Sequence, residues 1–329
     1  MTSNSIGKRF RDARDRGCEF LVKQMRSDGG IGELERGVSD YCKVAVALQV
    51  SGASAAANRL CNWIRVHGIT SSGDFGLRPE EARGYWYTYY NAWIIMGAHR
   101  QGHFDISQKG MDFVLGFWDA ESGGFYSTPG PSKPTSETLE DICITCGSGM
   151  AALYTNRIDV ARGVGKWLKK LRELQPSFPQ KLYSVYSRAA GLHTEFKPAE
   201  ATRYVNDYNP TGDGWFFNPG IAAGFLAELY KATGEAEWLN LAQEYMRQPE
   251  IANECFLRSL RAGKVCWAAS VLYTLTGDDK YRDLASRIGN YLVESQNADG
   301  SWNLPNNSLV SIDVTAEMTA WLDEAYQAL

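Results

Sequence analysis

The sequence predicts an all-α protein, a single (α/α)6 barrel in which six helical hairpins close into a ring. Helices of two kinds alternate along the 329 residues. Glycine-bearing turns also recur about every fifty residues, which is typical of an internal repeat. The alternation of period two that marks a half-buried strand is nearly absent. Residues 1–329 are therefore expected to form one domain.

Helices of the first kind are amphipathic. In the segment 160–174, Val, Trp and Leu side chains repeat at helical spacing on one side, whereas Lys166, Lys169 and Lys170 lie on the other. Such a helix buries one face and exposes the opposite one. The same pattern occurs in residues 7–26, 53–67, 103–118, 235–247 and 279–296.

Helices of the second kind are apolar on nearly all sides. Residues 142–153 and 265–275 contain no charged residue, and few occur in residues 41–50, 85–98, 219–230 and 312–326. A helix with this composition is buried all round. Six outer helices around six inner helices accommodate both kinds, with one hairpin per repeat.

The fourth repeat is interrupted by a long segment, residues 175–218, that is rich in Pro, Tyr, Gly and Asn. Long loops inside a compact domain are commonly binding loops or lids. We predict an irregular insertion here, with room for a short hairpin.

The last repeat ends in a distinctive pattern. Tyr291-Leu292 is followed by Gln296, Gly300 and Trp302 within YLVESQNADGSW. A helix ending at Gln296, a turn at Gly300 and a tryptophan folded back over the helix end account for this spacing. Looser versions of the turn occur at residues 28–30, 73–76 and 121–125.

This spacing resembles the QW motif of the α/α toroids. The resemblance extends over the whole chain through the repeat spacing and implies the (α/α)6 fold. The superfamily contains terpenoid cyclases such as the squalene-hopene cyclases, linalool dehydratase-isomerase, unsaturated glucuronyl hydrolases and sugar epimerases, so the fold alone selects no reaction. The chain lacks the Asp-x-Asp-Asp motif of squalene-hopene cyclases and the Asp-rich magnesium motif of ionising terpene synthases, and its four histidines fit a sugar epimerase poorly.

Candidate site residues lie where inner helices begin, because those ends meet at one mouth of such a barrel. The catalytic candidates are Asp40, Glu140, Asp141 and Glu317. The substrate-binding candidates are Tyr41, Tyr85, Trp86, Tyr89, Cys143, Trp215, Phe217 and Asp313. We expect Asp40, Tyr41, Tyr85, Tyr89, Glu140, Asp141 and Glu317 to share one pocket.

Each candidate also has a simpler interpretation. A carboxylate in the first helical turn caps free N–H groups. The aromatic residues account equally well for core packing. Cys143 and Cys146 have metal-type spacing without a second ligand pair, which indicates small buried side chains rather than zinc.

The leading hypothesis is a cofactor-independent, metal-independent cyclase, isomerase or hydro-lyase acting on a mostly apolar small molecule, an isoprenoid or a prenylated polyketide. A neutral carboxyl group in an apolar pocket would donate the proton. The alternatives are a glycoside hydrolase of the unsaturated glucuronyl type and a non-catalytic ligand-binding toroid. Inner helices without charges favour the first hypothesis over a sugar site.

Composition narrows the partners further. A net charge of −4 without a basic cluster argues against nucleic acid as the main partner. No apolar run reaches the length of about eighteen residues that a membrane span needs. The polar N-terminus and the odd number of cysteines, seven, favour a cytoplasmic protein. The oligomeric state does not follow from the sequence.

Overall fold

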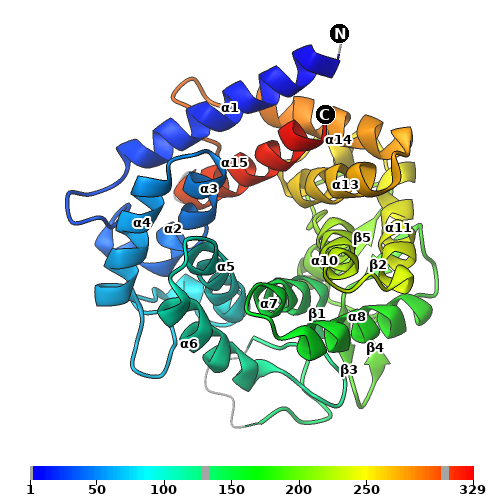
Figure 1. Ribbon diagram of the computed structural model, residues 1–329. Helices are drawn as coiled ribbons and strands as arrows, with labels where there is room; N and C mark the ends of the chain where they lie inside the picture. The colour runs from blue at the N-terminus through cyan, green and yellow to red at the C-terminus, as the bar shows by residue number, and fades with distance from the viewer. Residues whose placement is uncertain (1–2, 128–132, 305–310) are drawn as a thin grey trace.

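A computed structural model describes residues 3–127, 133–304 and 311–329. Within these ranges six inner helices form a closed ring (Figure 1). They are α3 (Val44–Val50), α5 (Tyr87–Arg100), α7 (Ile142–Tyr154), α10 (Asn218–Thr233), α13 (Gly263–Thr276) and α15 (Ser311–Ala328). Each packs against the next, and α15 closes the ring on α3.

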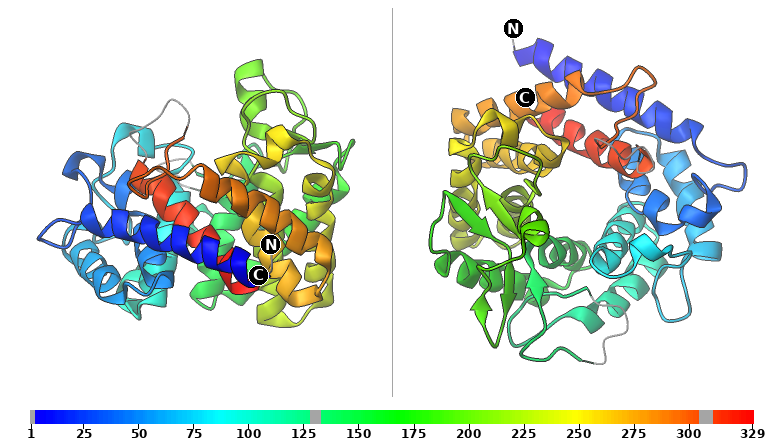
Figure 2. Two further views of the ribbon diagram at one scale, coloured as in Figure 1. Left: turned by 90° about the horizontal axis from the view of Figure 1, so that it is seen from above. Right: turned by 180° about the vertical axis from the view of Figure 1, so that it is seen from behind.

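Six outer helices surround this ring in the described part of the chain. They are α1 (Ser3–Lys23), α4 (Ser54–Trp63), α6 (Phe104–Val114), α8 (Ile158–Glu173), α11 (Ala236–Ile251) and α14 (Asp279–Glu294). The predicted (α/α)6 barrel is confirmed. Helix α1 packs along α15, so the two ends of the chain lie side by side (Figures 1 and 2).

Burial follows the two helix types that the sequence predicts. In α8 the apolar stripe is buried, including Val164, Trp167 and Leu171, whereas Lys169 and Lys170 are exposed. In α7, by contrast, residues 142–149 are buried on every side. An inner helix is covered by its two neighbours in the ring and by an outer helix, whereas an outer helix is covered on one side. The pattern of apolar residues therefore distinguishes inner helices from outer ones.

The glycine turns fasten consecutive outer helices to each other. Four of them have a glycine with φ between 90° and 92°, a conformation that a side chain rarely tolerates. A Cβ at each position would overlap backbone of the following outer helix. The pairs are Gly29 with Arg59, Gly73 with Lys109, Gly123 with Gly163, and Gly300 with Arg16. The last pair returns to α1 and completes the circle.

Trp302 seals the last repeat. Its side chain is fully buried, and its indole N–H donates to the carbonyl oxygen of Leu292 at 2.7 Å. Gln296 Nε2 donates to the carbonyl oxygens of Ala13 and Gly300. The interpretation of the motif as a helix end covered by a returning tryptophan is confirmed.

The insertion in the fourth repeat contains two small antiparallel sheets. Strand β3 (Val185–Ser187) pairs with β1 (Glu140–Asp141) and with β4 (Gly191–Leu192). Strand β2 (Lys181–Tyr183) pairs with β5 (Val205–Asp207), and α9 (Pro198–Tyr204) precedes β5. The insertion stands out from one side of the ring (Figure 2).

The remaining helical elements are short. They are α2 (Val38–Tyr41), α12 (Glu254–Leu257), the 3-10 turns η1 (Leu34–Arg36), η3 (Glu80–Ala82), η4 (Leu115–Phe117) and η5 (Leu260–Ala262), and the π-helical turn η2 (Ile64–Gly68). Among the helices of the described ranges, none has both the length and the apolarity required to cross a membrane.

Candidate functional site

A cavity of about 250 Å³ lies where inner helices begin. Five inner helices contribute a residue at or next to their N-terminal ends: Lys43 before α3, Trp86 before α5, Phe217 before α10, Lys264 in α13 and Asp313 in α15.

One wall of the cavity is aromatic. The rings of Trp86 and Trp215 have centroids 5.0 Å apart, and Trp215 lies 5.4 Å from Phe217. Tyr90 also lines this side. Such a wall offers ring faces and a large apolar surface to a bound molecule.

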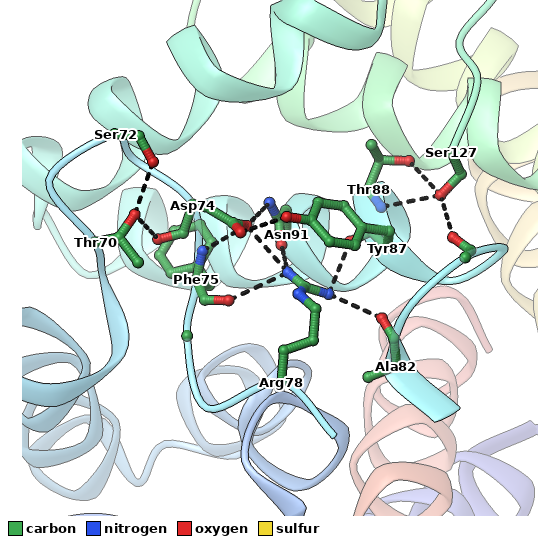
Figure 3. A network of polar contacts seen from close by, with 12 residues as sticks. Thr70, Ser72, Asp74, Phe75, Arg78, Ala82, Tyr87, Thr88, Asn91 and Ser127 are labelled. Carbon is green, nitrogen blue, oxygen red and sulfur yellow. Dashed lines mark hydrogen bonds and ion pairs between the residues drawn. The ribbon is translucent and has the colours of Figure 1, made fainter. Parts of the chain in front are cut away.

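The loop that carries Trp86 is held by a polar network (Figure 3). The guanidinium group of Arg78 donates to Asp74 Oδ1 at 3.1 Å and to Asn91 Oδ1 at 2.6 Å. It also lies 3.8 Å from the ring centroid of Tyr87, whose hydroxyl donates to Asp74. Because Tyr87 and Asn91 belong to α5, the network ties the loop to the inner helix and fixes the position of the aromatic wall.

The floor of the cavity carries a row of alternating charges. Lys43 Nζ donates to Asp313 Oδ2 at 2.8 Å and to Glu317 Oε2 at 2.5 Å. Glu317 also accepts a hydrogen bond from Lys264. We call the row Asp313–Lys43–Glu317–Lys264 the charged row. Both lysines are almost completely buried, at 4% and 5% exposure.

The charged row stabilises the charged forms of Glu317 and Lys43. Burial alone would raise the pKa of Glu317, but the ammonium groups of Lys264 and Lys43 outweigh it and hold this pKa below its ordinary value. Burial likewise opposes the charge on Lys43, yet Asp313 and Glu317 raise its pKa well above the ordinary value. Glu317 is therefore a carboxylate that orients the lysines and is unsuited to donate a proton.

Tyr89 occupies the centre of the floor. Its ring centroid lies 5.7 Å from Lys43 Nζ and 5.6 Å from Lys264 Nζ. Burial raises the pKa of its hydroxyl well above the ordinary value, so it remains a hydrogen-bond donor. Cys143 is fully buried, and burial raises the pKa of its thiol.

Asp141 lies behind the aromatic wall as the N-cap residue of α7. Its carboxyl group is hydrogen-bonded to the Tyr85 hydroxyl at 2.5 Å, the Ser184 hydroxyl at 2.7 Å and the backbone N–H of Cys143 at 2.8 Å. Burial raises the pKa of Asp141. The ring of Tyr85 packs on Trp86 and Trp215, with centroids 4.8 and 5.0 Å apart. The capping interpretation is correct for Asp141, and the carboxyl is also coupled to the wall.

Glu140 lies outside the cavity. It is 1% exposed and accepts hydrogen bonds from Trp167 of the outer helix α8 at 2.6 Å and from the Ser122 hydroxyl at 2.5 Å. Consecutive residues of a strand point to opposite faces, so β1 sends Glu140 between the helix layers and Asp141 towards Tyr85. Burial raises the pKa of Glu140 to about 7.

Asp40 and Tyr41 do not line the cavity either. Asp40 accepts from Arg36 Nε at 2.8 Å and borders a separate groove beside Gly32. The Tyr41 hydroxyl donates to the Gly76 carbonyl at 2.7 Å, and its ring packs on Trp63. The expectation of one shared pocket is thus wrong for these two residues and for Glu140. Tyr85 and Asp141 do not line the cavity either, and neither does the binding candidate Cys143. Tyr89 and Glu317 line the cavity, as do Trp86, Trp215, Phe217 and Asp313.

The argument from charge-free inner helices is weakened, because Lys43 and Lys264 at the starts of two inner helices line the cavity. The lining residues that sequence reasoning missed include the two buried lysines Lys43 and Lys264 and, at the rim, Arg261, which pairs with Asp213. Each lysine stands at the beginning of an otherwise apolar helical segment, where a single lysine is readily taken for a solvated helix end. Their pairing with Glu317 joins three different repeats, which spacing within one segment does not show.

A second, smaller cavity of about 70 Å³ lies towards the other end of the inner helices. It is lined mainly by apolar residues, including Trp267 and Trp321, with Glu324 beside them. Burial raises the pKa of Glu324 to about 7. Tyr89 and Lys264 line both cavities, so the floor layer separates them. Among the described residues, no group of three or more His, Cys, Asp or Glu side chains is arranged to hold a metal ion.

Comparison with known proteins identifies the class of fold. No family model and no curated protein matches the sequence. Among solved structures, the chain is similar to D-mannose isomerase, with a TM-score of 0.71, 12% identity and 97% of both chains covered.

Two further structures have the same architecture. A type II terpene cyclase from Scytonema, solved with geranylgeranyl dihydroxybenzoate, gives a TM-score of 0.65 at 12% identity over 100% of both chains. An unsaturated glucuronyl hydrolase specific for heparin gives 0.64 at 10% identity, covering 99% of this chain and 98% of the other. All three are enzymes with an (α/α)6 barrel, and at this identity the likeness establishes the fold of the present chain.

Proposed function

We propose that the chain is a cofactor-independent enzyme that cyclises, isomerises or removes water from a mostly apolar small molecule, an isoprenoid or a prenylated polyketide. The aromatic wall supports the apolar part of this substrate class. The enzymes of the same fold include a terpene cyclase solved with a prenylated aromatic acid. The cavity is small, so we expect a substrate, or a reacting portion of one, of modest size.

The pairing of Asp141 with Tyr85 carries the proposal. Burial favours the protonated form of Asp141, and its carboxyl is hydrogen-bonded to a hydroxyl at the edge of the aromatic wall. In this mechanism the neutral carboxyl group of Asp141 is the proton source for an alkene, epoxide or alcohol group of the substrate. The proton passes through the Tyr85 hydroxyl, whose own pKa burial raises, and the Tyr85 side chain must turn from Asp141 towards the cavity to deliver it. A proton lost from the product returns to the pair, which restores the enzyme.

The aromatic wall and the floor have separate roles in this mechanism. Ring faces of Trp86, Trp215 and Phe217 stabilise positive charge that develops on the substrate. The two ammonium groups and two carboxylates of the charged row cancel, so the floor adds no net charge that would repel such an intermediate. Water displaced from the cavity favours ring closure or elimination over hydration.

A second candidate is a glycoside hydrolase of the unsaturated glucuronyl type. Buried lysines on the cavity floor, next to ring faces that can stack on a sugar, favour it. The argument from charge-free inner helices ranked this candidate lower, and the two lysines that line the cavity weaken that argument.

The two candidates are separated by product analysis. The protein is incubated with EDTA and a panel of geranyl- and farnesyl-substituted dihydroxybenzoates, free isoprenols and unsaturated uronyl disaccharides, and products are analysed by mass spectrometry. Isoprenoid products of unchanged mass, or products lighter by one water, support the proposal. Release of an unsaturated uronic acid supports the hydrolase. Binding without turnover across the panel supports a non-catalytic toroid.

A further inference from the structure

The charged row has a positive end. Lys43 is bonded to a carboxylate on each side, Asp313 and Glu317. Among the described residues, Lys264 is bonded to Glu317 alone. The alternation of signs therefore begins with a carboxylate at Asp313 and finishes with an ammonium group at Lys264. This end lies in the cavity floor beside Tyr89.

The ammonium group of Lys264 has N–H donors that no acceptor among the described residues uses. It carries three N–H groups, and in the described part of the chain one hydrogen bond uses them, the bond to Glu317. Its other close neighbours are ring faces, Phe217 at 4.8 Å and Tyr89 at 5.6 Å from the ring centroid. A ring face attracts a cation but does not replace an oxygen acceptor.

The hydroxyl of Tyr89 also lacks an acceptor among the described residues. Its side chain is 2% exposed, so solvent does not supply one freely. The groups that act on this hydroxyl include Glu317 and Lys43, neither of which forms a hydrogen bond with it, and the indole N–H of Trp93, which can only donate. A buried donor without an acceptor is unfavourable, and a bound acceptor group relieves that cost.

We propose that Lys264 and Tyr89 together bind a carboxylate group of the substrate, so that the enzyme acts on a small organic acid. One carboxylate oxygen accepts from Lys264 Nζ. The other accepts from the Tyr89 hydroxyl once this buried group turns towards the cavity, and the body of the acid lies along the aromatic wall. This inference rests on the proposed function in one respect: it takes this cavity as the substrate site.

A monoanion fits the floor better than a phosphate. The charges of the row already cancel, so a single negative charge faces the ammonium end without an excess of anions, whereas a dianion would face Glu317 and Asp313 uncompensated. The shared chemistry, a carboxylate on a ring or apolar body, occurs both in an aromatic acid that bears a prenyl chain and in a uronic acid.

Calorimetric titration at constant ionic strength tests the inference directly. The probes are benzoate, cyclohexanecarboxylate and glucuronate, with benzyl alcohol as the neutral comparison and inorganic phosphate as the dianion. We expect at least one carboxylate to bind at least tenfold more tightly than benzyl alcohol and phosphate. Stronger binding of benzoate favours an aromatic acid as substrate, and stronger binding of glucuronate favours a sugar acid.

Variants locate the binding. Lys264→Met should weaken the preferred carboxylate at least tenfold, and Tyr89→Phe, which keeps the ring, about tenfold, as expected for a hydrogen bond to a charged group. Arg258→Met is the matched control. Arg258 is a partly exposed cation that lines a neighbouring cavity and pairs with Glu294. The double variant Lys264→Met with Glu317→Gln removes both buried charges and serves if the single variant does not fold.

The inference is overturned if benzyl alcohol binds as tightly as the carboxylates, if phosphate binds more tightly, or if the floor variants bind like the wild type. These outcomes are independent of catalysis. Carboxylate binding without turnover of any substrate would remove the proposed reaction and leave the anion site. Turnover of a neutral substrate without carboxylate binding would remove the anion site and leave the proposed reaction.

Discussion

Glu140 and Asp141 are consecutive in the chain, yet their carboxyl groups lie on opposite sides of β1. Glu140 contacts Trp167 between the helix layers, and Asp141 contacts Tyr85 beside the aromatic wall. The pair therefore supplies an internal comparison. Both carboxyls are buried and both have a raised pKa, but only Asp141 contacts Tyr85, which packs on the aromatic wall.

Replacing Asp141 by Asn should lower turnover by roughly a hundredfold or more, the size expected for loss of a general acid. Asn caps a helix as well as Asp, so the start of α7 should be retained. Glu140→Gln is the control and should keep most of the activity. Turnover of each variant on the substrate found by product analysis checks this. Loss of activity in Glu140→Gln with retention in Asp141→Asn would contradict the assignment.

The architecture could be predicted from the sequence because the apolar pattern of each helix reflects how much of its surface is buried. The charge-free run at 142–153 identifies an inner helix without reference to any other segment. The turn at Gly300 and the returning Trp302 likewise follow from local spacing.

The site could be predicted only in part. Helix starts identified Tyr89, Glu317 and Trp86, because all inner helices begin at the same end. The sequence does not show in which direction a side chain points at those helix starts. Glu140 points outwards because residues 140–141 form the strand β1. That strand exists because it pairs with β3, in the insertion 44 residues further along the chain. In the charged row, Lys43 is bonded to residues 270 and 274 positions away, so this pairing follows from closure of the ring.

The stability of the protein should depend on pH through Glu140. Its pKa is about 7 in the folded chain against an ordinary value of 4.5, so between these values the folded state holds a proton that the unfolded state has released. Its contribution is therefore favourable at low pH and is lost as pH rises through about 7. The whole effect corresponds to about 3 kcal/mol.

Urea denaturation of the wild type and Glu140→Gln between pH 5 and about 8 measures this dependence. The difference in unfolding free energy, wild type minus variant, should fall as pH rises. Glu324 also titrates near 7, but it is present in both proteins and cancels in the difference. A difference that stays flat or grows with pH would rule out the assignment.

Lys43 should be essential to stability. Replacing it by Met leaves Asp313 without its ammonium partner and Glu317 with one of two, which is expected to cost about 3–5 kcal/mol. The surface pair Lys169–Glu237 is the control, with both side chains about half exposed, so Lys169→Met should change the unfolding free energy by at most about 1 kcal/mol. Equal effects of the two substitutions in urea denaturation would show that the charged row is energetically inert.

The closure of the ring is tested by two glycines that both have positive φ. Gly300 has φ of 92°, and a Cβ there would overlap the carbonyl oxygen of Arg16 in α1. Gly277 ends α13 with φ of 67° and has open space where a Cβ would lie. Alanine at Gly277 should therefore cost only the left-handed conformation, about 1 kcal/mol, whereas alanine at Gly300 should cost about 3 kcal/mol or more, because strain and overlap add. Thermal unfolding of both variants gives the comparison. A Gly300→Ala protein as stable as Gly277→Ala would mean that the turn does not bear on α1, and that the packing of α15 against α1 closes the ring without it.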